Sequence, residues 1–258
     1  MKWSIIAVII AGCGHSASEP SDRIAKLESR LDKVTAALDQ ALGPPPPDPD
    51  KTYAVPITDE DPIEGPRDAK VTIVEGFDFL CPYCFLADPL VQQIRDKYPN
   101  DVRVVAKYLV VHGAPAASAG AYACAAAKQG KYSEMRQAMW SRLFTLEAGQ
   151  PHAHADQIAS LDAIASSVGV DPGKAAGDAQ SCKKWIDESQ RDLAAFGVHA
   201  TPAFFVNGRP LRDRSFDGFD KLVTQELAKA NHSDVAAADY YAKEIVGKGL
   251  HHVAGRFD

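Results

Sequence analysis

The sequence has few cysteines, no excess of positive charge and no apolar segment long enough to cross a membrane as a helix. Of its 258 residues, 28 are Lys or Arg and 34 are Asp or Glu, and the formal net charge of −6 argues against a nucleic-acid-binding protein. The longest apolar run, Trp3 to Gly12, is about half of the roughly 20 residues that a membrane-spanning helix needs. Five cysteines are too few for a scaffold built on disulfides, so each cysteine requires its own explanation. What the sequence does have is a 46% share of apolar residues, which is enough for a folded core.

Residues 1–13 have the pattern of an export signal, with Lys2 followed by an apolar segment and then Ile10-Ala11-Gly12-Cys13. This ending resembles the bacterial lipobox. The resemblance implies that Cys13 is lipid-modified and that the protein faces the periplasm from a membrane anchor, with the outer membrane as the default. An ordinary signal peptide with an incidental cysteine is the alternative. Both readings place the chain outside the cytosol, where disulfides persist.

Residues 14–50 have the composition of a stalk and a linker. Residues 19–42 carry apolar side chains at alternating spacings of three and four, which predicts a helix with a heptad seam, capped by Ser21 or Asp22. The helix either associates with a copy of itself, giving a homo-oligomer, or serves as a solvated spacer. The proline-rich segment 43–50 predicts a polyproline II strut that holds the next domain about 25 Å away. The seam consists of Ile24, Leu27, Leu31, Val34, Leu38 and Ala41.

Residues 51–230 alternate between strand-like and helix-like segments and predict an α/β domain. It opens with a βαβ unit, whose two strands should be parallel, continues with a helical insert and closes with a hairpin and a helix. Residues 231–258 form a tail with a helix-like stretch at 235–246, which either packs on the domain or contacts a partner. The predicted elements are an edge strand at 53–58, strands at 70–77 and 101–110, helix 82–98, the insert at about 113–197 with breaks near 130, 149–151 and 169–173, the hairpin 202–211, and helix 216–230.

The sequence Cys81-Pro82-Tyr83-Cys84 lies at the junction of a predicted strand and a predicted helix. Proline suits the first helical position, which places Cys81 at the N-cap. There the free backbone N–H groups and the helix dipole favour a thiolate, so Cys81 is the predicted nucleophile and Cys84, one turn later, the resolving thiol. A zinc site would need a second cysteine or histidine pair at short spacing, which is missing. We therefore predict a redox dithiol without a metal or a cofactor.

A second motif, Thr201-Pro202 before the last strand pair, completes the pattern. Together the two motifs resemble the thioredoxin superfamily, and specifically its DsbA-like branch, which has a helical insert between its βαβ and ββα halves. The resemblance covers roughly residues 53–230. It implies a thioredoxin fold, a redox-active Cys81–Cys84 disulfide, and a cis-proline loop in which the backbone of Thr201 pairs with a substrate peptide. A purely structural turn at Pro202 is the alternative.

Glu75 lies six residues before Cys81 and matches the acidic position that the superfamily keeps beneath its resolving cysteine. Burial should raise the pKa of such a carboxyl, which would suit it to exchange a proton with Cys84. The alternative is a glutamate that points to water. Asp78 falls in the turn, where only local hydrogen bonds are expected of it.

Tyr83 bears on the direction of electron flow, because DsbA has a histidine at this position and a tyrosine cannot supply a cation. We expect the pKa of Cys81 to lie above the value of about 3.5 known for DsbA, and the reduction potential to lie below that of DsbA. The dipeptide Pro82-Tyr83 with a Thr-Pro loop is similar to the DsbG type, a reductase or isomerase branch. That branch dimerises through a folded domain, which residues 1–50 do not contain.

Cys124 and Cys182 both fall in the helical insert. In an oxidising compartment they most simply pair with each other, and DsbA-like proteins often have such a second bridge. Two buried free thiols are the alternative.

The sequence therefore predicts an envelope thiol-disulfide oxidoreductase that forms, reduces or isomerises disulfides in exported, cysteine-containing proteins or peptides. The resemblance implies a DsbB-like or DsbD-like membrane redox partner. Two other functions stay open: a non-catalytic peptide-binding module, and a copper(I) carrier that uses Cys81 and Cys84 as soft ligands.

Overall fold

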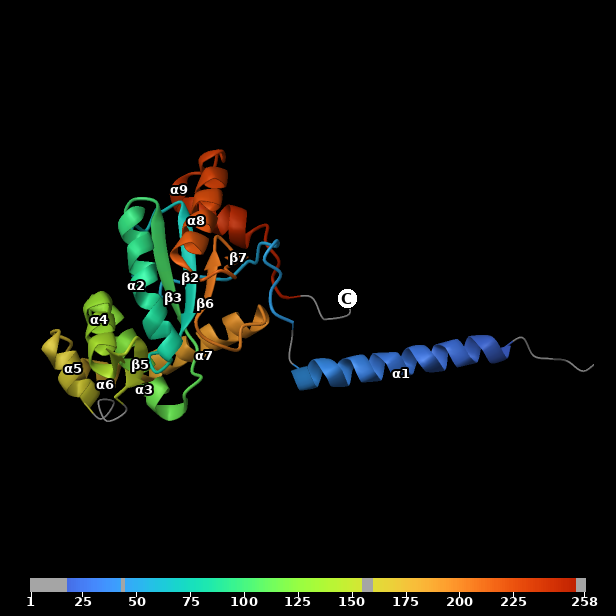
Figure 1. Ribbon diagram of the computed structural model, residues 1–258, viewed down its shortest axis with the longest axis horizontal. Helices are drawn as coiled ribbons and strands as arrows, with labels where there is room; N and C mark the ends of the chain where they lie inside the picture. The colour runs from blue at the N-terminus through green and yellow to red at the C-terminus, as the bar shows by residue number, and fades with distance from the viewer. Residues whose placement is uncertain (1–17, 43–44, 155–159, 254–258) are drawn as a thin grey trace, which may run out of the picture. The chain divides into compact units, whose positions relative to one another are not determined.

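The computed structural model describes residues 18–42, 45–154 and 160–253 (Figure 1). The predicted export signal and Cys13 lie outside the described residues. The chain divides into two compact units, residues 1–44 with 255–258 and residues 45–254, and each is described by itself.

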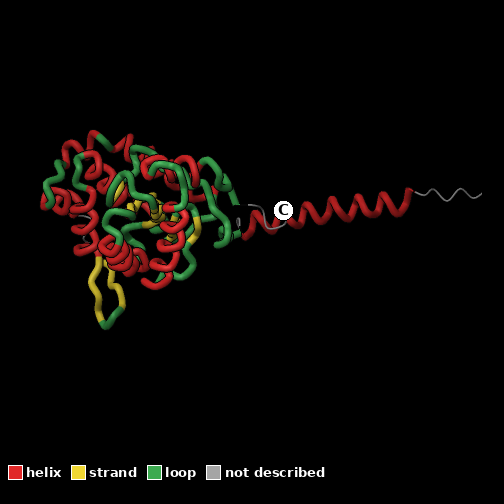
Figure 2. The backbone as a smooth tube through the Cα atoms, turned by 90° about the horizontal axis from the view of Figure 1, so that it is seen from above, coloured by secondary structure: helices red, strands yellow, loops and turns green. Residues whose placement is uncertain are grey.

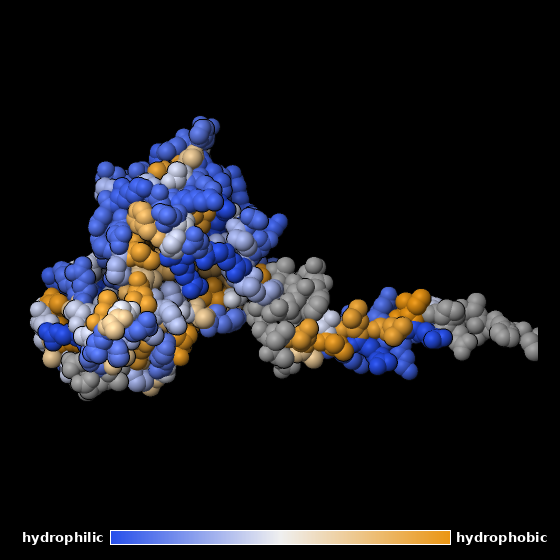
Figure 3. Space-filling model, in the orientation of Figure 1, coloured by the Kyte–Doolittle hydropathy of each residue, from blue (hydrophilic) through white to orange (hydrophobic). Residues whose placement is uncertain are grey.

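Helix α1 spans Ser18–Leu42 in the first unit, as the heptad pattern predicts. It begins before Ser21, so the predicted caps Ser21 and Asp22 are wrong and both residues lie inside the helix. One side of α1 is apolar and the other polar, as Figure 3 shows. The apolar side chains Ile24, Leu27, Leu31, Val34 and Leu38 are all exposed. No helix among the described residues combines the length and apolar character needed to span a membrane.

The second unit is built on a five-stranded mixed sheet in the order β1-β3-β2-β6-β7. The two central strands are parallel, with Glu75 opposite Ala106 and Phe77 opposite Tyr108. Both are buried along their whole length, which explains why most of their residues are apolar and many are β-branched. The strands are β1 (Ile63–Glu64), β2 (Val71–Phe77), β3 (Val102–Tyr108), β6 (Ala203–Val206) and β7 (Arg209–Pro210). This order confirms the predicted βαβ unit and the closing hairpin.

Helices cover both faces of the sheet because successive residues of each strand point to opposite faces. Val71 and Ile73 of β2 pack in one cluster with α2 (Pro82–Lys97) and α8 (Phe216–Asn231). Val74 packs in another cluster with α7 (Ala179–Ala195) and the C-terminal segment. Glu75 follows the same alternation as Ile73 and therefore lies on the α2 face.

The insert between β3 and β6 forms a third cluster with the C-terminal ends of β2 and β3 (Figure 1). A disulfide joins Cys124 of α3 to Cys182 of α7, so the pairing that the sequence favours is present. The helices of the insert are α3 (Gly113–Lys128), α4 (Tyr132–Leu143), α5 (Leu161–Ser167), α6 (Pro172–Gly177) and α7.

The insert also contains a β-hairpin, where the sequence predicted only a break between helices. Strands β4 (Phe144–Glu147) and β5 (Gln150–Ala153) pair around Ala148 and Gly149, which have φ values of 50° and 77°. Positive φ at both central residues is the geometry of a tight hairpin turn, and alanine is an uncommon residue there. Figure 2 shows the hairpin projecting from the second unit, residues 45–254, which we call the head.

Two predictions about the N-terminal edge of the domain are wrong. Residues 53–58 do not form an edge strand: Tyr53 makes only an isolated bridge to Leu250, and Pro56 lacks the N–H that a strand ladder needs. The edge strand on the β3 side of the sheet is β1.

The proline-rich segment is not a strut over its described part, and the tail packs on the domain, which is one of the two alternatives that the sequence leaves open. The guanidinium of Arg212 donates to the carbonyl of Pro47 at 2.6 Å, which holds this segment on the head. The tail contains α9 (Ala237–Tyr240) and the π-helix η2 (Tyr241–Val246), and the Tyr241 hydroxyl donates to the Val55 carbonyl at 2.8 Å. The compact unit of residues 45–254, the head, therefore includes part of the predicted linker and the tail.

Candidate functional site

Cys81 occupies the N-cap of α2, and Pro82 is the first helical residue, as the sequence predicts. The Cys81 backbone is extended (φ −82°, ψ 116°), and its N–H donates to the Asp78 carbonyl at 3.0 Å. Proline costs nothing at this position because the first N–H groups of a helix have no partner inside the helix. The strand-to-helix junction thus places the Cys81 sulfur at the positive end of α2.

The two thiols of the motif have opposite electrostatic environments. A hydrogen bond from the Cys84 thiol is the largest cause that lowers the pKa of Cys81, to about 5, against the opposing effect of burial. Thr201 and the backbone N–H groups of Cys84 and Tyr83 lower it further. Burial is the largest cause that raises the pKa of Cys84. At neutral pH, Cys81 is therefore the thiolate and Cys84 keeps its proton.

The peptide bond between Thr201 and Pro202 is cis. This loop immediately precedes β6 and brings the Thr201 carbonyl to 3.5 Å from the Cys81 sulfur. The Cys81–Cys84 pair and the Thr201-Pro202 loop are more than a hundred residues apart in the sequence. They nevertheless form one site.

Glu75 is fully buried, so the alternative that it points to water is wrong. Its carboxylate contacts Arg136 of α4: the Arg136 Nη1 lies 2.9 Å from Oε2, and Nη2 donates to Oε1 at 3.1 Å. Burial raises the pKa of Glu75, and the Arg136 guanidinium opposes this shift. The Glu75 carboxylate therefore contacts a guanidinium, and its proton exchange with Cys84 stays a prediction.

Arg136 was not predicted from the sequence, although it connects the insert to the sheet and to α2. Its Nε donates to Asp88 of α2 at 2.7 Å, and the Trp140 indole N–H donates to the same oxygen at 3.0 Å. The sequence does contain a signal: Arg136 interrupts the buried stripe of α4, four residues after Tyr132 and four before Trp140. A charge on a buried helix face needs a buried partner.

Asp78 was expected to make only local hydrogen bonds, and that expectation is too narrow. Its buried carboxylate accepts from the backbone N–H of Val111 at 2.9 Å and of His112 at 3.1 Å, and lies 3.0 Å from the His112 Nδ1. It also accepts from the N–H of Leu80 at 2.7 Å. Asp78 therefore ties the turn before Cys81 to the loop that follows β3.

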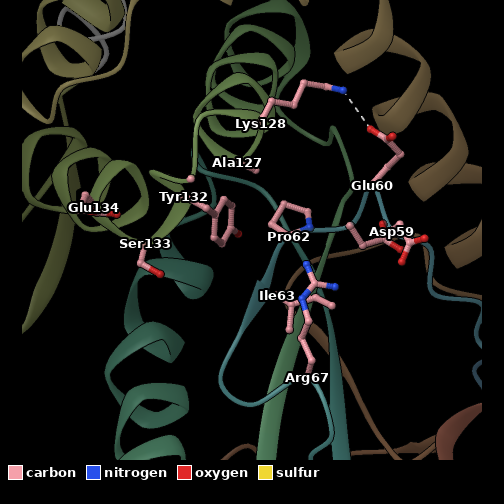
Figure 4. A pocket seen from close by; sticks show the side chains of 12 residues that line it. Asp59, Glu60, Pro62, Ile63, Arg67, Ala127, Lys128, Tyr132, Ser133 and Glu134 are labelled. Atoms are coloured by element: carbon pink, nitrogen blue, oxygen red, sulfur yellow. Dashed lines mark hydrogen bonds and ion pairs between the residues drawn. The ribbon is translucent and has the colours of Figure 1, made fainter. Parts of the chain in front are cut away.

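A separate polar hollow, shown in Figure 4, lies beside β1 and the start of α4. Lys128 and Glu60 form an ion pair of 2.9 Å at its rim. None of the residues that line it is a cysteine or histidine. Within the described ranges, no three His, Cys, Asp or Glu side chains are grouped so that they could hold a metal ion.

A family model described as Thioredoxin matches residues 58–225, which is more than half of the chain. The chain belongs to the thioredoxin family. Its fold is that of the DsbA-like members, with the helical insert between the two halves of the motif.

Solved structures of thioredoxin-family proteins are similar to most of the head. A thioredoxin-like oxidoreductase from Silicibacter pomeroyi is 26% identical, with a TM-score of 0.56 over 65% of this chain and 92% of that one. The catalytic domain of Proteus mirabilis ScsC is 25% identical, with a TM-score of 0.55 over 68% and 93%. Bacillus subtilis BdbD, at 18% identity and a TM-score of 0.58 over 69% and 99%, shares the fold.

Curated relatives carry the similar segment within longer proteins. A protein named Na(+)/H(+) antiporter NhaA from Herminiimonas arsenicoxydans is 35% identical over 175 residues, which cover 63% of this chain and 26% of that protein. NhaA 3 from Salinispora tropica is 36% identical over 155 residues, covering 58% and 22%. The chain thus spans about a quarter of the length of these relatives, and the printed activity is theirs.

The thioredoxin fold and the asymmetric dithiol equip this chain for thiol-disulfide exchange. The low pKa of Cys81 supplies a nucleophile and a good leaving group, while the high pKa of Cys84 keeps it protonated until it is needed.

Proposed function

We propose that this protein is an envelope thiol-disulfide oxidoreductase that exchanges disulfides with exported polypeptides through Cys81 and Cys84. The observation that carries the proposal is the contrast between the two thiols: a low-pKa sulfur at the helix N-cap, next to the cis-proline loop, and a buried partner with a raised pKa. The export pattern of residues 1–13 supports the compartment, and Cys13 is the proposed point of lipid attachment.

In the reducing direction, the Cys81 thiolate attacks one sulfur of a substrate disulfide, and the other substrate sulfur leaves as a thiolate that takes up a proton. Cys84 then loses its proton and attacks the Cys81 sulfur of the mixed disulfide, which releases the second substrate thiol and leaves Cys81 and Cys84 joined. Two electrons pass from the dithiol to the substrate. In the oxidising direction, a substrate thiolate attacks Cys81 of the protein disulfide, and a second substrate thiolate resolves the mixed disulfide.

The proposed direction is reduction or isomerisation, with a DsbD-like membrane partner supplying electrons; a DsbB-like partner would serve the oxidising direction. Tyr83 in place of a histidine supports this choice, because a tyrosine adds no positive charge beside the thiolate. Neither the non-catalytic binding module nor the copper(I) carrier has an observation of its own in its favour.

The pKa of Cys81 makes a direct prediction for its reactivity. The rate of alkylation of reduced Cys81 by iodoacetamide should rise with pH around a midpoint of about 5, because the thiolate is the reactive form. The reduction potential of the Cys81–Cys84 pair should be lower than that of DsbA, at about −120 mV. A midpoint near 8.5, the pKa of a free cysteine, would contradict the proposed nucleophile, and a potential near that of DsbA would contradict the proposed direction.

The exposed seam of α1 supports a proposal about assembly. Its five apolar side chains lie along one side of the helix and are exposed. We expect them to pack against the same residues of another copy, as in a coiled coil. Light scattering on the protein without residues 1–13 should give a multiple of the monomer mass, and removal of residues 14–44 should give a monomer. A monomer in both cases would show that α1 is a solvated spacer.

A further inference from the structure

Two loops from neighbouring strands flank Cys81 at one end of the sheet. Cys81 follows β2, which lies between β3 and β6 (Figure 1). Strand β6 is antiparallel to β2, so the Thr201-Pro202 loop enters it at the end where β2 stops. Strand β3 is parallel to β2, so the loop that contains His112 leaves it at the same end. The reactive sulfur therefore lies between the cis-proline loop on one side and the His112 loop on the other.

The carboxylate of Asp78 joins the His112 loop to the turn that precedes Cys81. Its Oδ2 lies 3.0 Å from the His112 Nδ1 and accepts the His112 backbone N–H at 3.1 Å. The carbonyl of Asp78 accepts the backbone N–H of Cys81 at 3.0 Å. One residue thus holds both the imidazole and the backbone of the nucleophile.

This contact with Asp78 leaves the second ring nitrogen of His112 free for chemistry. An ionised carboxylate only accepts hydrogen bonds, so Nδ1 carries the proton that points at Asp78. In the described parts of the chain, Nε2 has no hydrogen-bond partner, and the side chain is 39% exposed. His112 is the N-cap residue of α3, but its side chain makes no capping hydrogen bond. A buried carboxylate that orients an imidazole with a free Nε2 is an arrangement with which histidines transfer protons.

The proton requirement of disulfide exchange lies at the substrate. Cys81 attacks as a thiolate and needs no base. The sulfur that leaves the substrate is an ordinary alkyl thiolate, which takes up a proton at neutral pH because the pKa of a free cysteine is about 8.5. During attack the three sulfurs lie in line, which places the leaving sulfur about 4 Å from the Cys81 sulfur. A proton donor for it must stand beside Cys81, as the His112 loop does.

We propose that His112, oriented by Asp78, is the general acid and base for the substrate sulfur. The inference rests on the proposed function and adds a catalytic residue to it. In the reducing direction, the Cys81 thiolate bonds to one substrate sulfur, and the electron pair of the broken S–S bond stays on the other sulfur. That sulfur takes the Nε2 proton of the imidazolium, and the half-exposed ring regains a proton from water. In the oxidising direction, the neutral ring takes the proton of a substrate thiol, whose sulfur then attacks Cys81 of the protein disulfide.

The other titratable groups near the ring keep their charge between pH 6 and 8. The hydrogen bond from the Cys84 thiol lowers the pKa of Cys81 to about 5, and burial raises the pKa of Cys84. Burial also raises the pKa of Tyr108, whose hydroxyl lies 3.5 Å from the Asp78 carboxylate. Within the described ranges, Asp78 is the one charged group within 4 Å of the ring, and the first turn of α3 has no acidic residue. A change of rate in this pH range therefore reports on His112.

The experiment compares two disulfides that differ in their leaving thiol. Oxidised glutathione releases an alkyl thiolate, whereas dithiobis(nitrobenzoate) releases an acidic aromatic thiolate that leaves without a proton. Both carry carboxylates, so a simple attraction to the imidazolium would act on both. Their rate constants with the reduced full-length protein are measured from pH 6 to 8 for the wild type, His112→Gln and His199→Gln. His199 is a matched control: it is exposed, lies three residues before Pro202 and has no carboxylate partner in the part of the chain that the structure describes.

His112→Gln should lower the rate constant for oxidised glutathione about tenfold at pH 6 and leave that for the aromatic disulfide unchanged. The effect is smaller than general acids often give, because a thiolate can also leave unprotonated. The wild-type constant for glutathione should fall from pH 6 to pH 8, since histidine loses its proton in this range while Cys81 is already a thiolate. His112→Gln should remove this pH dependence, and His199→Gln should behave as the wild type.

An unchanged glutathione constant in His112→Gln would overturn the inference. An equal fall for both disulfides, or an equal fall in His199→Gln, would overturn it as well, because the effect would then not depend on the leaving thiol or on the Asp78 contact. A wild type that reacts with neither disulfide would instead overturn the proposed function.

A solvent isotope effect tests the same step without any variant. Transfer of a proton from Nε2 to the leaving sulfur should make the wild-type reaction with oxidised glutathione slower in D₂O than in H₂O at pH 6. The reaction with the aromatic disulfide should show a smaller effect. Equal isotope effects with the two disulfides would overturn the inference.

Discussion

Replacing Cys81 with serine should lower the rate of disulfide exchange with a cysteine peptide on the order of a thousandfold or more, because no other described thiolate faces the Thr201-Pro202 loop. Cys84→Ser should instead accumulate a mixed disulfide between Cys81 and the substrate, since the resolving thiol is missing. The two variants are compared by stopped-flow kinetics and by mass spectrometry of the trapped complex.

Thermal unfolding of each serine variant serves as the control, because serine at the N-cap or at the buried position 84 can change the stability of α2 independently of the chemistry. A double Cys81→Ser, Cys84→Ser protein that keeps its phenotype in the cell would contradict the enzymatic proposal. That result would favour the non-catalytic binding module.

Replacing Arg136 with methionine should lower the free energy of unfolding by about 3–5 kcal/mol, because it leaves the buried carboxylate of Glu75 without its counterion. Adding Glu75→Gln to this variant should restore part of the loss. Urea denaturation measures both. Lys243→Met, which removes an exposed ion pair to Asp239, is the matched control and should change little.

The sign of the pH dependence follows from the same pair. Without Arg136, burial acts unopposed and raises the pKa of Glu75 further, so the folded state binds a proton more tightly than the unfolded state does. The free energy of unfolding of Arg136→Met should therefore fall as the pH rises above the unfolded pKa of glutamate, and the deficit should be larger at pH 8 than at pH 5. A deficit that does not change with pH would show that Glu75 is not the group left unpaired.

The sequence predicted the parts of the site that depend on local rules. The proline after Cys81 indicates where the helix begins, and the apolar segment before Cys81 indicates a buried strand. Cys81 therefore lies at a strand-to-helix junction. The hairpin 203–210 followed from Asn207-Gly208, since glycine and asparagine tolerate positive φ. The fold class rested on the order of such elements, and the Thioredoxin match confirms it.

The sequence did not predict what depends on distant contacts. The hairpin at 144–153 has alanine rather than asparagine at the first turn position, and the contact of Phe144 with Phe85 at its base joins residues far apart in the sequence. In the sequence, Arg136 is one polar residue of a predicted helix. Its role follows from the packing of α4, which brings it to Glu75 and Asp88. The composition of the proline-rich segment predicted an extended strut. Composition gives no information about a contact with Arg212, which lies far along the chain and holds the segment on the head.

The tail also determines where the two ends of the head lie. The N–H of Leu250 donates to the carbonyl of Thr52 at 2.9 Å, and the N–H of Ala54 donates to the carbonyl of Leu250 at 2.8 Å, so the chain enters and leaves the head at neighbouring points. A domain whose two ends meet can be appended to another polypeptide, or inserted into one, without a change in its interior. The same geometry would allow a longer protein to carry the head, with its reactive Cys81 sulfur, as an appended or inserted domain.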